Sequence, residues 1–99
     1  MEPELAFSMG KTFGQIKNII EKIENMNSED KNQLNTLFSN LLKDIKKSSS
    51  NNSIKEIEQK IKKFYIINNI EESKTMAKEI YILIDKFNET VYMKLKYNI

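Results

Sequence analysis

The sequence lacks the side chains on which most enzyme and metal chemistry depends. Its 99 residues include no histidine, no cysteine, no tryptophan and no arginine, so that all 16 basic residues are lysines. Without imidazole or thiol groups, the chain has neither the most common general base of nucleophilic catalysis nor the ligands that transition metals prefer. Without cysteine it also has no disulfide framework. We therefore expect a protein that is not an enzyme and that carries no cofactor and no metal.

Long apolar runs and a strong charge imbalance are absent as well. No segment approaches the roughly 18 consecutive apolar residues of a membrane-spanning helix. The N-terminal residues begin acidic and lack the basic region and apolar run of a secretory signal. Apolar residues make up 39% and charged residues 30% of the chain, with a formal net charge of +2, which is typical of a folded domain. We expect one domain over residues 1–99, located in the cytoplasm.

Apolar residues recur at intervals of three and four along most of the chain, a pattern that predicts amphipathic helices. Four helices are expected, at residues 3–26, 28–47, 54–68 and 70–96. The short polar connections between them favour antiparallel neighbours, so we predict an all-α fold, a small antiparallel four-helix bundle. Helical hairpins that complete such a bundle by dimerisation are the alternative. Gly10 and Gly14, inside the first helix, indicate either a close approach of a neighbouring helix or a frayed start.

Polar residues mark where the expected helices begin. Ser53 and Glu56 have the spacing of a capping box, in which each side chain accepts a hydrogen bond from the other residue's backbone N–H. Three residues offer an N-cap for the second helix, namely Asn25, Asn27 and Ser28. Together with Asn68, Asn69 can close the third helix in a left-handed conformation, and it can also cap the fourth.

Several apolar residues fall outside the stripes that should face the core. They are Tyr65 and Ile66 in the third expected helix, Tyr81 and Ile82 in the fourth, and Tyr92 beyond them. A helix that is apolar on more than one face is either central in its own fold or shares a surface with a partner. Tyrosine is also enriched at interfaces. We predict an interface with another protein or a second copy through the third and fourth helices, the alternative being that these residues complete the core.

Lysines gather on both sides of the polar loop between the second and third helices. The candidate basic patch consists of Lys43, Lys46, Lys47, Lys55, Lys62 and Lys63. Such a patch can neutralise phosphates, so weak non-specific nucleic-acid binding is an alternative function. The net charge of +2 and the absence of arginine, the residue that reads guanine with two hydrogen bonds, favour a simply solvated face instead. Residues 91–99 mix aromatic, aliphatic and lysine side chains, which makes a membrane surface a weaker alternative partner.

The chain also resembles a known family in the order and spacing of its helices. The segment Ile57-Glu58-Gln59-Lys60-Ile61-Lys62-Lys63-Phe64-Tyr65 is followed by Asn68-Asn69 and another amphipathic helix. In helix order, length and capping pattern, residues 19–87 resemble the small antiparallel four-helix immunity proteins that protect producers of pediocin-like bacteriocins. The resemblance implies an intracellular, non-enzymatic protective protein that acts at a membrane protein complex. We carry no functional residue over from that family.

Overall fold

The computed structural model describes residues 3–48 and 52–97, with side chains described for residues 3–47 and 52–89. This part of the chain is mostly helical and contains no strand. Its elements are α1 (Pro3–Glu21), the short 3-10 helix η1 (Ile23–Asn25), α2 (Ser28–Ser48), α3 (Ser53–Ile66) and α4 (Ile70–Tyr97). The all-α prediction is therefore confirmed.

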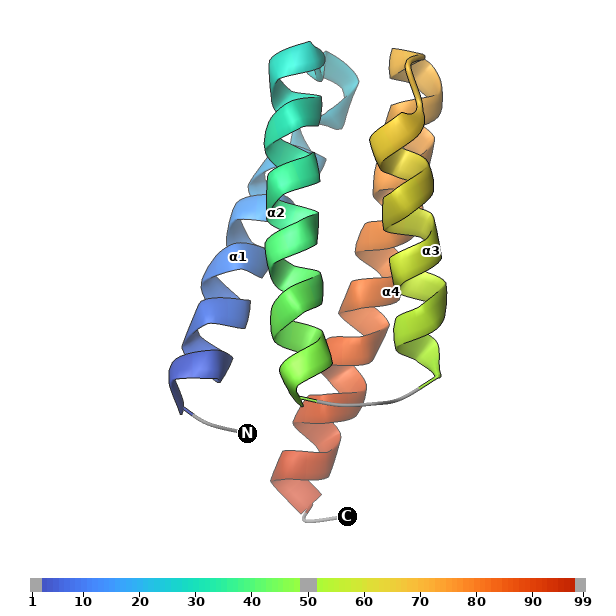
Figure 1. The fold of residues 1–99 in the computed structure, drawn as a ribbon. Helices are drawn as coiled ribbons and strands as arrows, with labels where there is room; N and C mark the ends of the chain where they lie inside the picture. Colours follow the sequence, from blue (N-terminus) through green and yellow to red (C-terminus); the bar gives the residue numbers. More distant parts are fainter. Residues whose placement is uncertain (1–2, 49–51, 98–99) are drawn as a thin grey trace.

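The four α-helices run alternately up and down (Figure 1). Each helix packs against the next one in sequence, and α4 returns to contact α1 and closes the bundle. The connections from α1 to α2 and from α3 to α4 lie at one end of the molecule (Figure 1). At the other end lie the first residues of α1 and α3 and the last residues of α2 and α4 (Figure 1). All four helices come from one chain, so the bundle is complete without a second copy.

The core is built from the apolar stripes that the sequence predicts. Phe38 of α2 and Phe64 of α3 are fully buried and meet edge to face, with ring centroids 5.4 Å apart and planes inclined by 81°. The other buried apolar residues are Met9, Ile16, Ile23, Met26, Leu34, Leu37, Leu41, Ile45, Ile54, Ile57, Ile61, Ala77, Ile80, Ile84 and Phe87. Burying a large side chain of this kind stabilises the fold by about 1.5–3 kcal/mol, which explains why the periodic positions determine the packing.

The first helix is shorter than the predicted range of 3–26. α1 ends at Glu21, and the chain then forms the single 3-10 turn Ile23–Asn25 before Met26 adopts an extended conformation with φ −61° and ψ 131°. The physical reason is the sharp reversal into α2, which a continuous helix could not make. Ile23 and Met26 remain buried because the turn folds over the end of the core.

The structure does not place Ser53 at the N-cap position that the predicted capping box with Glu56 requires. α3 begins at Ser53 itself, so the N-cap position falls on Asn52, whose side chain makes no capping hydrogen bond to the described residues. A reciprocal box instead lies at the start of α2. There the Asp30 N–H donates to Asn27 Oδ1 at 2.8 Å, and the Asn27 N–H donates to Asp30 Oδ2 at 3.2 Å. Asn27 is therefore the N-cap among the three candidates.

At the connection between α3 and α4, the predicted end of α3 is wrong, whereas the predicted N-cap of α4 is confirmed. α3 ends at Ile66 rather than at residue 68, because Ile67 is already extended with φ −71° and ψ 126°. A left-handed asparagine is therefore not what ends α3. At the start of α4, Asn69 Oδ1 accepts a hydrogen bond from the Glu72 N–H at 3.1 Å, so the predicted cap at Asn69 is confirmed.

Candidate functional site

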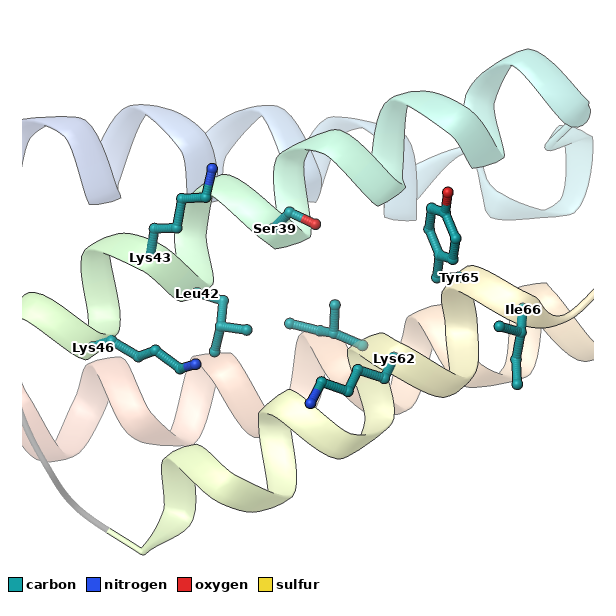
Figure 2. Close-up of a pocket in the computed structure, with 8 residues that line it drawn as sticks. Ser39, Leu42, Lys43, Lys46, Lys62, Tyr65 and Ile66 are labelled. Atoms are coloured by element: carbon teal, nitrogen blue, oxygen red, sulfur yellow. The ribbon is translucent and has the colours of Figure 1, made fainter.

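A groove of about 470 Å³ runs between α2 and α3 on the outside of the bundle (Figure 2). Eight residues line it, namely Ser39, Leu42, Lys43 and Lys46 from α2 and Ile61, Lys62, Tyr65 and Ile66 from α3. The α2 residues are three or four positions apart, or adjacent, and therefore lie along one face of that helix. The groove thus exists because two helices present neighbouring side chains to the same strip of surface.

The middle of the groove is apolar. Ile61 is buried against the core, and the half-buried Leu42 lies opposite it on α2. Tyr65 and Ile66 follow directly after the buried Phe64, so the helical rotation of about 100° per residue turns both side chains outward. Tyr65 is 69% exposed and Ile66 is 71% exposed. Two large apolar side chains therefore stand in water next to an apolar floor.

Three lysines surround this apolar strip, and all three are exposed. Figure 2 shows Lys43 and Lys46 of α2 toward one end of the groove and Tyr65 and Ile66 of α3 toward the other. Lys62 of α3 lies between them (Figure 2). The groove therefore has a cationic end and an aromatic and aliphatic end.

One carboxylate offsets part of this positive charge. Lys46 of α2 forms an ion pair with Glu58 of α3. The hydrogen bond from Lys46 lowers the pKa of Glu58 below its ordinary value, and the charges of Lys46 and Lys62 add to this effect against a partial desolvation. Among the described residues, neither Lys43 nor Lys62 has a carboxylate within ion-pair distance. The groove therefore keeps a surplus of positive charge.

The structure divides the predicted basic patch. All six of its lysines are exposed, but only Lys43, Lys46 and Lys62 line the groove. The remaining three, Lys47, Lys55 and Lys63, lie outside the groove lining. Because Lys46 is paired with Glu58, the patch also carries less free charge than its composition indicates.

The structure describes the side chains of four of the five predicted interface residues, and only two of the four line the groove. Tyr65 and Ile66 lie together at the groove. Ile82 is 52% exposed on α4 but does not line the groove, and Tyr81 is half-buried and stacked against Phe13 of α1. Tyr92 belongs to α4, but its side chain lies outside the described residues. The ring of Tyr81 therefore serves the packing of α4 on α1.

The α2 side of the groove and one exposed aromatic residue are not among the predicted site residues. Leu42 directly follows the buried Leu41, and the spacing of apolar residues alone suits both to the core. The pattern that indicates the groove is a second row of side chains on α2, formed by Ser39, Leu42 and Lys46, next to the row that faces the core. Phe7 of α1 is 74% exposed, and it lies between stripe positions in the sequence.

In the part of the chain that the structure describes, no group of three or more acidic residues is placed to hold a metal ion. Within the same residues, every helix is too short or too polar to cross a membrane. No protein-family model matches the chain, and no curated protein or solved structure is significantly similar to it.

Proposed function

We propose that this chain is a non-enzymatic protein of the cytoplasm that acts by binding another protein in the groove between α2 and α3. The supporting observation is the exposure of Tyr65 and Ile66 beside the apolar floor of Leu42 and Ile61. Covering apolar surface is favourable by about 25 cal/mol per Å², and tyrosine is a frequent anchor of protein interfaces. A partner that covers these side chains would gain this free energy.

The proposed surface differs from the pair of helices expected from the sequence. It keeps Tyr65 and Ile66 of α3 but replaces α4 with α2 as the second helix. The reason is that Tyr81 of α4 is already stacked on Phe13 of α1, whereas Leu42 of α2 lines the same groove as Tyr65 and Ile66. A protective role at a membrane protein complex would use the same surface, with that complex as the partner.

Binding to a second copy through this groove is disfavoured by charge. A two-fold symmetric dimer places the same patch of each subunit face to face. Such a dimer would bring Lys43 and Lys62 of both copies close together while Glu58 is already paired with Lys46, and like charges in contact are destabilising. Light scattering after size exclusion, repeated over a dilution series, tests this point, and the expected result is a monomer.

Nucleic-acid binding is a weaker candidate, which the exposed Lys43 and Lys62 support. It would depend on the lysines alone and would fall steeply with salt. An apolar strip lined by Tyr65 and Ile66 contributes nothing to phosphate neutralisation. A mobility-shift experiment at about 50 mM salt, where electrostatic binding is strong, is expected to show no complex with duplex or single-stranded probes.

The central test compares three purified baits against an extract of the cells that make the protein. The baits are the unmodified chain, the double variant Tyr65→Glu/Ile66→Glu, and Phe7→Glu as a matched control at an exposed apolar position away from the groove. All three should show the same circular dichroism and melting temperature, because the altered side chains are exposed. We expect a partner that the unmodified and Phe7→Glu baits retain and that the double variant loses.

The partner must then bind as a purified protein with the same dependence on the groove. A complex of two purified components that Tyr65→Glu/Ile66→Glu weakens at least about tenfold would support the proposal, since interface anchors contribute more than 1 kcal/mol each. Equal binding to all three baits, or loss with Phe7→Glu alone, would show that the groove is not the binding surface.

A further inference from the structure

We infer that the groove receives an amphipathic α-helix of the partner, with acidic residues beside its apolar stripe. This inference rests on the proposed function and specifies the chemistry of the partner. It follows from three properties of the groove, which are its length, its charge and its openness.

The length of the groove matches a short helical segment. On α2 the lining residues extend from Ser39 to Lys46, a rise of about 10 Å at 1.5 Å per residue. A helix that presents apolar residues at positions i, i+4 and i+7 covers the same distance with two turns. Docked between α2 and α3, such a helix would set its apolar stripe against Leu42, Ile61 and Tyr65.

The charge of the groove indicates acidic flanks on that helix. Lys43 and Lys46 stand on the α2 side and Lys62 on the α3 side, whereas Glu58 is paired with Lys46. A docked helix with glutamates next to its apolar stripe would bring carboxylates toward Lys43 and Lys62. A helix with basic flanks would meet like charges on both sides, which opposes docking.

The openness of the groove favours a protein segment over a small amphiphile. Sites for small molecules commonly cover 70–90% of the ligand's surface. Here Tyr65 and Ile66 leave about 70% of their own surface in water and so do not close over the groove. A helix needs only one of its faces covered, which is the kind of contact that this surface offers.

The test uses three synthetic helical peptides of about 18 residues, a length at which an isolated helix begins to be stable. The acidic peptide carries leucines at i, i+4 and i+7 with glutamates beside that stripe. In the basic peptide lysines replace those glutamates, and in the scrambled peptide the acidic composition is kept but the stripe is broken. Each is titrated into the full ¹⁵N-labelled chain at low salt and followed by amide chemical shifts.

We expect the acidic peptide to bind, with its largest shifts at residues 39–46 and 61–66. The basic peptide should bind at least about tenfold more weakly, since two exposed ion pairs contribute up to about fivefold each. The scrambled peptide should cause no comparable shifts. Raising the salt concentration should reduce the difference in affinity between the acidic and basic peptides, because exposed charges are screened.

A matched pair of double variants distinguishes the effect of the groove lysines on peptide affinity from the effect of the protein's net charge. Lys43→Glu/Lys62→Glu should lower the affinity for the acidic peptide at least about tenfold and raise the affinity for the basic peptide. Lys47→Glu/Lys55→Glu makes the same change in net charge at exposed lysines outside the groove. It should leave the affinity for the acidic peptide within about twofold, because separated surface charges are largely screened.

Three results would overturn the inference, namely equal affinity for the acidic and basic peptides, equal weakening by both double variants, or no groove shifts with the acidic peptide. None of them decides the proposed function, which depends on the comparison of baits with an intact partner. A partner that requires Tyr65 and Ile66 but docks through a basic or non-helical segment would leave that function standing. Groove shifts caused by phosphatidylserine-containing vesicles, but by none of the peptides, would point to a membrane surface and contradict both proposals.

Discussion

Tyr81 of α4 lies flat against Phe13 of α1, with ring centroids 5.2 Å apart and the two planes inclined by 7°. The stack joins the first and last helices, which contact each other less extensively than α1 contacts α2. A contact of this kind holds the closing side of the bundle together. Tyr81 is therefore part of the internal packing, although its position in the sequence also suited an interface.

Replacing Tyr81 with alanine should destabilise the fold. We expect Tyr81→Ala to lower the free energy of unfolding by about 1–3 kcal/mol, less than for a fully buried aromatic residue because the side chain is half-buried. Urea denaturation followed by circular dichroism measures this change. Tyr65→Ala is the matched control and should change the free energy of unfolding by less than about 0.5 kcal/mol, because Tyr65 is exposed.

A double-mutant cycle with Phe13→Ala isolates the stack itself. The expected coupling between the two positions is about 0.5–1.5 kcal/mol, the usual range for aromatic pairs. Additive losses, with no coupling, would show that the two rings contribute only through their separate burial.

Most of the fold could be predicted from the sequence, because the spacing of apolar residues within one helix defines its apolar face. Ile57, Ile61 and Phe64 of α3 are an example. The groove could not be predicted in the same way. Whether Leu41 or Leu42 faces the core depends on how α2 is rotated against its neighbours, and no local pattern encodes that rotation. Tyr81 illustrates the same limit, since its partner Phe13 is 68 positions away in the sequence.

The N-caps provide a second test of how local chemistry stabilises this bundle. Asn27→Ala should lower the free energy of unfolding by about 0.5–2 kcal/mol, because it removes the acceptor for the Asp30 N–H at the start of α2. Asn52→Ala should have a much smaller effect, since that side chain makes no capping hydrogen bond within the described residues. Thermal melts of both variants measure the difference. Equal losses at Asn27 and Asn52 would contradict the assignment of the cap.

The two glycines of α1 offer a route to a more stable protein. Both lie inside the helix, and within the described residues no atom of another segment lies within 4 Å of a Cβ added at either position. They therefore do not mark a close approach of a neighbouring helix. Gly10→Ala and Gly14→Ala should therefore each raise the free energy of unfolding by up to about 1 kcal/mol, because alanine has the higher helix propensity.

The control for this effect is Gln15→Ala, an exposed change on the same helix. It should alter the free energy of unfolding by less than about 0.5 kcal/mol, since glutamine and alanine differ little in helix propensity. The two glycine variants lie four positions apart and should be nearly additive when combined. A loss of stability in either glycine variant would show that a neighbouring side chain occupies the space.

The ion pair between Lys46 and Glu58 predicts a pH dependence of definite sign. Because the folded-state pKa of Glu58 is lowered, the pair stabilises the fold fully above the ordinary glutamate pKa of about 4.3. Its contribution is lost as the pH falls through the lower, folded-state value. A ¹³C NMR titration of the Glu58 carboxyl should show Lys46→Met raising this pKa toward its ordinary value and Lys62→Met raising it less. Lys47→Met is the control and should leave the pKa of Glu58 unchanged. An equal pKa shift with all three variants would show that the lysines act on Glu58 collectively and that Lys46 has no specific role.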